Sequence, residues 1–154
     1  MDATSPQHLS SLLERFVRAE DVEQLAEVVV TEIQTLTGYD RVLLYRFERE
    51  GDCQVLAEVG RGAPPSFLGM RFPGMNIPAQ ARRLYVEQRI RQIPDVDYQP
   101  VPIIPALSPV DGEPLDLSPC HLRSVSPFHR AFMRSMGTTA TMSISLVIDG
   151  RLWG

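Results

Sequence analysis

One segment, residues 71–85, combines a tight turn with polar and cationic side chains. Its sequence is RFPGMNIPAQARRLY, in which Pro73 and Pro78 bound the turn. Proline at the first position of a helix already has the helical φ angle, so we expect a helix to start at about Ile77. The turn presents Asn76 and free backbone groups beside a pocket, with arginines one helical turn further on. The segment therefore predicts a ligand-binding turn.

The basic residues restrict the possible chemistry. All fifteen are arginine, and the chain contains no lysine. A chain without lysine cannot form a Schiff base through a side-chain amine, and it has no phosphate-loop or kinase lysine. Arginine binds planar carboxylates in a bidentate manner better than lysine does. A genome-wide preference for arginine codons explains the composition equally well, but the excluded chemistries stay excluded.

Side chains for catalysis or metal binding are sparse. The three histidines are His8, His121 and His129, and no set of nucleophile, base and orienting group surrounds them. Two cysteines do not make a disulfide framework, and their spacing from the histidines does not fit a metal site. We expect Cys53 to be buried in a strand. Cys120 is expected in a loop, where the neighbouring His121 can raise its reactivity.

Composition is typical of one globular domain. The chain has 154 residues, of which 44% are apolar and 22% charged, with a net charge of −4. No basic cluster favours nucleic acid, no apolar run is long enough to span a membrane, and the N-terminus does not resemble a signal peptide. We therefore expect a cytoplasmic protein in a reducing compartment.

The first half of the chain predicts two helices and a hairpin. Apolar residues recur at helical spacing over residues 8–19, and Asp21 followed by Gln24 indicates the start of a second helix that ends at Gly38. Residues 41–47 and 53–59 are predicted strands around a glycine-containing turn. We expect residues 60–74 to form a loop and residues 77–89 to form a helix.

The second half predicts a long irregular connection, a helix and a hairpin. Eight of the thirteen prolines lie between Pro94 and Pro127, a density that excludes long regular elements. Residues 127–136 predict a helix ending at Gly137, and residues 141–148 alternate as a strand. Asp149-Gly150 is a hairpin-turn signal, and the partner strand begins at Arg151.

These elements predict an α+β fold, with helices packed on an antiparallel sheet. We expect residues 1–20 to form an N-terminal helix or extension and residues 21–154 to form the domain. Because the sequence stops inside its last predicted strand, we expect a fragment of a longer protein. The N-terminal helices are candidates for a homodimer contact, and packing on the domain's own sheet is the alternative.

The turn segment, together with LRSVSPFH at residues 122–129, resembles the bilin-binding GAF domain of phytochromes, most closely the bacterial ones. The resemblance spans about residues 20–154 and implies an α+β GAF fold that binds biliverdin or a related linear tetrapyrrole. It implies chromophore contacts from both segments and from the strands. They are Tyr45, Phe72, Asn76, Ile77, Pro78, Tyr85, Arg91, Arg123, Ser126, Phe128, His129, Phe132, Thr141 and Ser143.

The resemblance assigns different roles to these residues. Aromatic and aliphatic side chains line the conjugated plane, and Arg91 and Arg123 bind the two propionates together with the hydroxyl groups. His129 corresponds to the family's pocket histidine, beside the central pyrrole nitrogens. Taken singly, each residue has an ordinary structural explanation: Arg91 as a solvated surface residue, Tyr45 as core.

The chain departs from the family pattern at several positions. Asn76 stands where the family has aspartate, so it keeps the backbone carbonyl but loses a group that exchanges protons. Phe132 replaces a common tyrosine, and Phe128 occupies the position of the attachment cysteine of plant and cyanobacterial phytochromes. These changes predict weakened photoconversion, enhanced far-red fluorescence and no thioether at Phe128. Cys120 is the candidate for covalent attachment.

The sequence therefore predicts a photosensory, non-enzymatic module that passes a light signal to an output domain outside this chain. One alternative is a chromophore-free GAF module for dimerisation or redox signalling. A second is an enzyme domain whose carboxylate substrate is held by Arg91 and Arg123, although the sequence supplies no general base for it. Neither nucleic acid nor membrane is an expected partner.

Overall fold

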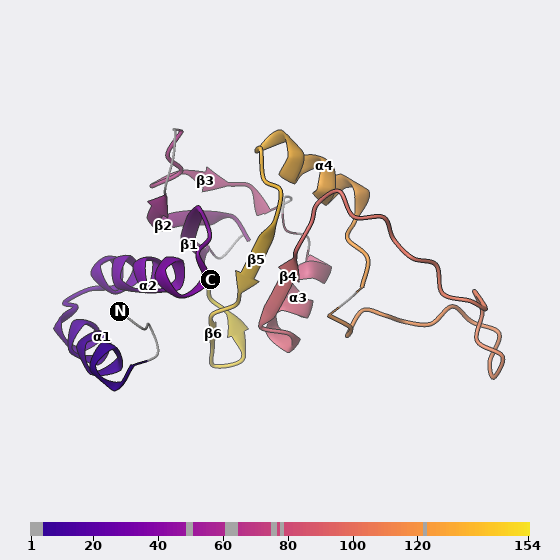
Figure 1. The fold of residues 1–154 in the computed structure, drawn as a ribbon, viewed down its shortest axis with the longest axis horizontal. Helices are drawn as coiled ribbons and strands as arrows, with labels where there is room; N and C mark the ends of the chain where they lie inside the picture. Colours follow the sequence, from indigo (N-terminus) through magenta and orange to yellow (C-terminus); the bar gives the residue numbers. More distant parts are fainter. Residues whose placement is uncertain (1–4, 49–50, 61–64, 75–76, 78, 122) are drawn as a thin grey trace. The chain divides into compact units, whose positions relative to one another are not determined.

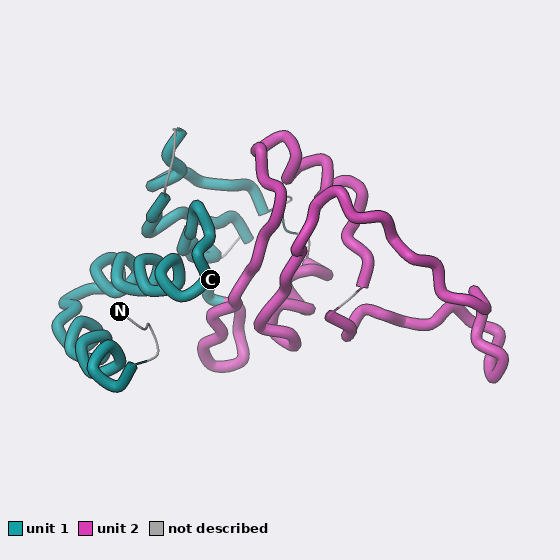
Figure 2. The backbone as a smooth tube through the Cα atoms, in the orientation of Figure 1, with its two compact units in different colours: residues 1–78, 153–154 teal, residues 79–152 magenta. Residues whose placement is uncertain are grey.

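The computed structural model describes residues 5–48, 51–60, 65–74, 77, 79–121 and 123–154. The chain forms two compact units, which Figure 2 colours separately. One unit contains residues 1–78 and 153–154, and the other contains residues 79–152. No helix of the described residues has both the length and the apolar character needed to cross a membrane.

The first unit contains the helices α1 and α2 and a three-stranded antiparallel sheet of order β1-β2-β3 (Figure 1). Helix α2 lies against β1 and β2. Its buried Ala26 and Val30, together with Leu44, Val55 and Ala57 of the sheet, supply buried apolar residues of this unit. The elements are α1 (Pro6–Arg18), α2 (Val22–Thr37), β1 (Arg41–Phe47), β2 (Cys53–Gly60) and β3 (Arg71–Phe72).

Local sequence explains the bounds of α2. The Asp21 side chain accepts the Gln24 N–H at 2.8 Å, and the Gln24 side chain accepts the Glu20 N–H at 3.1 Å. The first bond satisfies a backbone donor that the first turn of a helix leaves free, and the second ties the residue before the N-cap to that turn. At the other end Gly38 has a φ of 73°, a left-handed conformation that suits glycine.

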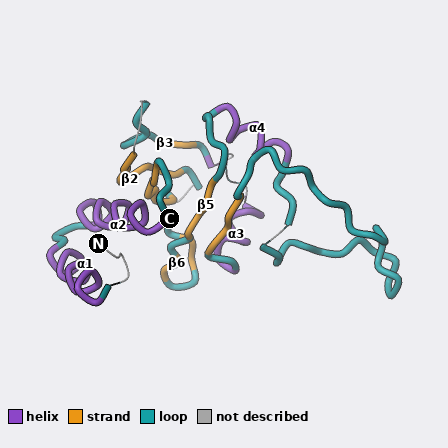
Figure 3. The backbone as a smooth tube through the Cα atoms, in the orientation of Figure 1, coloured by secondary structure: helices purple, strands orange, loops and turns teal. Residues whose placement is uncertain are grey.

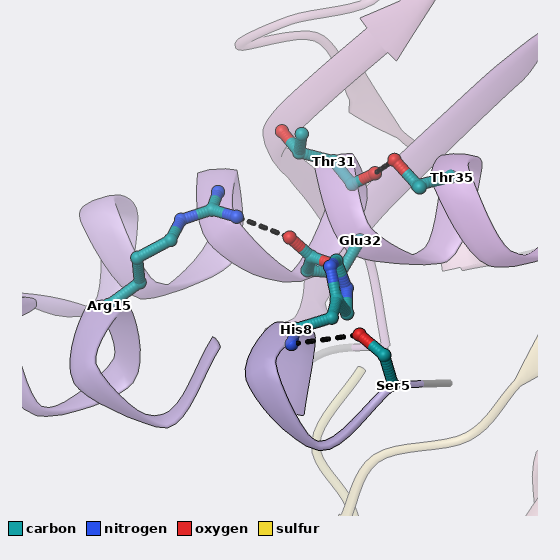
Figure 4. A network of polar contacts seen from close by, with 6 residues as sticks. All are labelled: Ser5, His8, Arg15, Thr31, Glu32 and Thr35. Carbon is teal, nitrogen blue, oxygen red and sulfur yellow. Dashed lines mark hydrogen bonds and ion pairs between the residues drawn. The ribbon is translucent and has the colours of Figure 1, made fainter. Parts of the chain in front are cut away.

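A buried carboxylate joins α1 to α2 (Figure 4). Glu32 on α2 is only 5% exposed, and its Oε2 lies 2.8 Å from Nε2 of His8 on α1. Its other oxygen accepts a hydrogen bond from Arg15, also on α1. Glu32 therefore links two turns of α1 to the helix that covers the sheet.

The second unit contains two short antiparallel pairs, β4 with β5 and β6 with β7, together with two helices (Figure 3). Ile93, Val96 and Met133 form a buried cluster against which Val125 packs. The elements are α3 (Ala79–Glu87), β4 (Ile90–Ile93), α4 (Pro127–Ser135), β5 (Thr141–Ile144), β6 (Val147–Ile148) and β7 (Arg151–Leu152).

Most predicted elements are confirmed. The helices that were predicted at residues 8–19 and from Asp21 to Gly38 are present, as are the first hairpin and the turn at Asp149-Gly150. Cys53 is buried, as expected, and burial raises the pKa of its thiol. The described residues between β4 and α4 contain no helix or strand, in agreement with the proline density.

The structure corrects three predictions and adds one strand. The helix predicted for residues 77–89 runs over Ala79–Glu87. The predicted loop at 60–74 contains β3, and β4 was not predicted. The strand predicted for 141–148 is divided into β5 and β6, because the chain leaves the β4 pairing after the Ser145 N–H donates to the Arg89 carbonyl at 2.7 Å.

Candidate ligand-binding site

Two arginine side chains are held beside each other in the second unit. Arg91 on β4 donates through Nη2 to the Arg123 carbonyl at 2.8 Å, and through Nη1 to the His121 carbonyl. Arg123 donates through Nη1 to Gln88 Oε1 at 2.8 Å and to the Cys120 carbonyl at 2.9 Å. These contacts join the irregular connection to β4 and fix both guanidinium groups.

The two guanidinium groups form a centre of positive charge. Burial lowers the pKa of Arg91, and the charge of Arg123 lowers it further. In the part of the chain that the structure describes, no carboxylate pairs with either arginine, and their acceptors are carbonyl and amide oxygens. Two adjacent cations without an anionic partner favour binding of an anion, and a planar carboxylate fits the guanidinium fork.

His129 lies in the first turn of α4 and is half-buried. Burial lowers the pKa of its imidazole, and the charge of Arg91 lowers it further. The neutral form, with one donor and one acceptor nitrogen, is therefore favoured at neutral pH. Met133 follows one helical turn later and belongs to the buried cluster that contains Ile93 of β4, so this side of α4 packs over β4.

Two of the expected hydroxyl groups lie across the strand pair from β4. Ser143 is the register partner of Arg91, and Thr141 is the partner of Ile93. Directly paired residues place their side chains on the same face of a sheet. The Ser143 hydroxyl therefore shares a face with the Arg91 guanidinium.

The other expected residues of the second unit are placed along α3, α4 and the loop before α4. Tyr85 on α3 is half-buried and lies within electrostatic reach of Arg91. Ser126 precedes α4, and its side chain makes no capping hydrogen bond to that helix. Phe132 lies 6.4 Å from His129 between ring centroids, whereas Phe128 is 89% exposed. Cys120 is a free, half-buried cysteine.

Three expected residues that the structure describes lie in the first unit. Tyr45 on β1 is half-buried and stacks edge-on against Phe47 at 5.6 Å. Phe72 on β3 lies 6.0 Å from Phe67, and Ile77 donates its N–H to the Gly74 carbonyl at 3.2 Å. The other two expected residues of this segment, Asn76 and Pro78, lie outside the described residues.

Sequence reasoning missed two residues that order the arginine pair and the segment around it. Gln88 accepts from Arg123, and the Tyr98 hydroxyl accepts the Val125 N–H at 2.7 Å. The Arg130 guanidinium lies over the Tyr98 ring, 5.0 Å from its centroid. Tyr98 lies in the proline-rich connection and Gln88 just after a helix, and neither position carries a periodic signal that would single it out.

Comparison with known proteins gives consistent matches. A family model described as GAF domain matches residues 21–154. Cyanobacterial phytochrome B of Nostoc sp. is 46% identical over 85% of this chain, and a bacteriophytochrome of Pseudomonas aeruginosa is 48% identical over 87%. The chain spans only 17% and 18%, respectively, of the length of these relatives.

A solved structure supports the same grouping. The crystal structure of the chromophore-binding domain of an unusual bacteriophytochrome from R. palustris superposes with a TM-score of 0.88 and 42% sequence identity. The match covers 95% of this chain and 49% of that one.

Proposed function

The chain belongs to the GAF domain family, and from that membership we propose that it binds biliverdin or a related linear tetrapyrrole as the light-sensing part of a phytochrome-type receptor. The similar proteins from Nostoc sp. and Pseudomonas aeruginosa carry phytochrome names, and the similar R. palustris domain is described as chromophore-binding. The fold and the charge distribution of this chain are compatible with that role.

The pairing of Arg91 with Arg123 is the observation that carries the proposal. A bilin has two propionate groups, and each needs a cation or hydroxyl partner when it leaves water. The two guanidinium groups are fixed by carbonyl and amide oxygens but lack carboxylate partners among the described residues. We propose that they bind the propionates, with the hydroxyl groups of Ser126, Thr141 and Ser143 completing the contacts.

The remaining contacts rest on the chemistry of the side chains. The neutral imidazole of His129 can donate to a ring carbonyl or accept from a pyrrole N–H. Tyr45, Phe72, Ile77, Pro78, Tyr85, Phe128 and Phe132 provide apolar and aromatic surface for a conjugated plane. When bound, a bilin supplies light absorption and a double bond that isomerises, and the protein's part is to bind, orient and hydrogen-bond it.

We further propose weak photoconversion and enhanced far-red fluorescence. The side chain of Asn76 is an amide, which does not exchange a proton with a chromophore as a carboxylate does. Phe132 has no hydroxyl donor. Asn76 thus removes a proton-exchanging group and Phe132 removes a hydroxyl donor, so the hydrogen bonds rearrange less readily after excitation and more excited molecules return to the ground state by emission.

Cys120 is the proposed site of any covalent link. It is half-buried, and its carbonyl accepts a hydrogen bond from Arg123, which places its backbone beside the proposed propionate site. Zinc-induced fluorescence on a denaturing gel detects a bilin that is covalently attached. Loss of that signal in Cys120→Ala, with the absorption band retained, would assign the attachment to this thiol.

The module signals without catalysis of its own. We propose that it acts in the cytoplasm, passes its signal to an output domain outside this chain, and self-associates through its N-terminal helices. Size-exclusion chromatography with light scattering measures the self-association.

Titration with biliverdin tests the function. The proposal predicts a new far-red absorption band that saturates at one bilin per chain, with far-red emission. The absence of any band at saturating biliverdin would contradict it and would favour the alternative, a chromophore-free GAF module for dimerisation or redox signalling. The absence of an attachment cysteine at Phe128 and the amide at Asn76 both support that alternative.

A further inference from the structure

The turn between β1 and β2 contacts the segment that leads into Asn76. Asp52, the last residue before β2, accepts the Gly74 N–H through Oδ1 at 2.8 Å. Gly74 lies two residues after the end of β3 and two residues before Asn76. A side chain of the hairpin turn is therefore bonded directly to the start of the predicted ligand-binding turn.

This contact begins where the pairing of β2 with β3 ends. Cys53 is the register partner of Phe72, so the next pair outward would join Asp52 to Pro73. Pro73 has no N–H and cannot continue the ladder. The next donor along the chain is the Gly74 N–H, and a side-chain carboxylate accepts it in place of a backbone carbonyl. Asp52 thus holds the chain to the sheet beyond the last backbone pair.

The backbone of the turn between β1 and β2 also lies close to the Cα of Gly74. A Cβ atom at position 74 would lie 2.7 Å from the carbonyl carbon and oxygen of Gly51, and 3.2 Å from the Asp52 nitrogen. Only a residue without a side chain allows two backbones to approach so closely. The turn that confines it is closed by hydrogen bonds from Gly51 N–H to the Glu48 carbonyl at 3.0 Å and from Glu48 N–H to the Asp52 carbonyl at 2.7 Å.

Gly74 is also hydrogen-bonded to Ile77. Its carbonyl accepts the Ile77 N–H at 3.2 Å, a bond between the residues that bracket Met75 and Asn76 in the sequence. Gly74 is therefore hydrogen-bonded both to Asp52, before β2, and to Ile77, which follows it in the chain.

We propose that Asp52 is a positioning residue for this turn: by accepting the Gly74 N–H, it sets the place of the Asn76 segment and, through it, the absorption and emission of a bound bilin. The optical part rests on the proposed function, whereas the hold on Gly74 exists in the protein without ligand. The carboxylate acts as an acceptor beyond the last backbone pair, so an amide oxygen at the same position can replace it.

Three variants separate this role from charge and from general stability. Asp52→Ala removes the acceptor, and Asp52→Asn keeps a side-chain oxygen with a similar shape. Asp97→Ala is the matched control, because it also removes one exposed carboxylate, with the loss of an ion pair to Arg134. In the bilin-free proteins, amide exchange at Gly74 is measured by NMR. In the biliverdin-loaded proteins, the absorption maximum and the fluorescence yield are measured.

We expect Asp52→Ala to speed exchange of the Gly74 amide by about five-fold, the effect of losing one modest hydrogen bond. We also expect a shifted absorption maximum and a lower fluorescence yield. In Asp52→Asn and in the control Asp97→Ala, we expect the Gly74 exchange rate, the absorption maximum and the fluorescence yield to equal those of the wild type. Unchanged Gly74 exchange in Asp52→Ala overturns the hold on the turn. Faster Gly74 exchange with unchanged spectra overturns the optical part of the proposal. A wild-type protein that gives no bilin band overturns the proposed function. In that case the exchange rate of the Gly74 amide alone tests whether Asp52 positions Gly74.

Discussion

Asn76 is the residue at which the predicted departure from the family pattern replaces a carboxylate by an amide, which does not exchange a proton. Asn76→Asp is therefore expected to increase the light-driven conversion of the biliverdin-loaded protein and to lower its fluorescence yield. Light-minus-dark difference spectra and emission spectra measure both quantities. Asn76→Ser is the control, because it also changes the side chain but adds no carboxylate. A fully reversible photocycle in the wild-type protein would contradict the proposed role of this amide.

A second residue, His129, predicts a pH dependence of stability. Its folded-state pKa lies below the ordinary value of 6.5, because burial and then Arg91 disfavour the charged form. As the pH falls below 6.5, the unfolded chain binds a proton that the folded chain resists, so the free energy of unfolding decreases down to the folded-state pKa. Urea unfolding of the bilin-free protein at about pH 7.5 and about pH 5.5 measures this loss.

His129→Gln should show a smaller loss between these two pH values, because glutamine does not titrate. His121→Gln is the matched control, since the His121 side chain is exposed. An equal loss in wild type and His129→Gln would contradict the electrostatic description of this histidine.

For single residues, the types were predictable from the sequence, but their partners were not. The arginine pair was expected from the resemblance, yet the sequence does not indicate that Arg91 donates to the carbonyls of residues 121 and 123. Those contacts bridge about thirty positions of irregular chain. Only the folded path of that connection determines them.

Among the elements, α1 depends on one residue of α2 for its polar contacts. Glu32 is buried, whereas the His8 and Arg15 side chains remain 22% and 41% exposed. Glu32→Gln removes the charge and leaves an amide in its place, so we expect a loss of about 1–3 kcal/mol in the free energy of unfolding. Amide exchange in α1 should rise more than exchange in the sheet. Urea unfolding and hydrogen exchange measure the two effects.

Glu27→Gln is the control for this prediction, because Glu27 lies on the same helix and is exposed. An equal, small effect of the two substitutions would show that α1 does not depend on the buried carboxylate.

The elements with strong local signals were predicted and the short ones were not. Helix α2 has a capping residue, a helical apolar pattern and a terminal glycine, and each of these acts locally. In contrast β3 has two residues and β4 has four, Ile-Arg-Gln-Ile, without alternation of apolar and polar side chains. Such short strands form only because a partner strand offers hydrogen bonds, and the partners, β2 for β3 and β5 for β4, are not adjacent to them in the sequence.

For the whole molecule, the proposed function requires the two segments singled out by the sequence to bind one ligand. The GAF family model covers residues 21–154 and so includes both segments. The predicted α+β fold is confirmed, whereas the assignment of the individual chromophore contacts remains a prediction.

A comparison of biliverdin with its dimethyl ester, which lacks both carboxylates, decides whether the arginine pair binds the propionates. Absorption titrations give the affinity of each ligand for the wild type, the double variant Arg91→Gln/Arg123→Gln and the control Arg134→Gln. We expect the wild type and the control to bind biliverdin at least about ten-fold more tightly than the ester, from loss of charge-assisted hydrogen bonds. The double variant should lose this preference. Equal affinities of the wild type for acid and ester, or an undiminished preference in the double variant, would contradict propionate binding by Arg91 and Arg123.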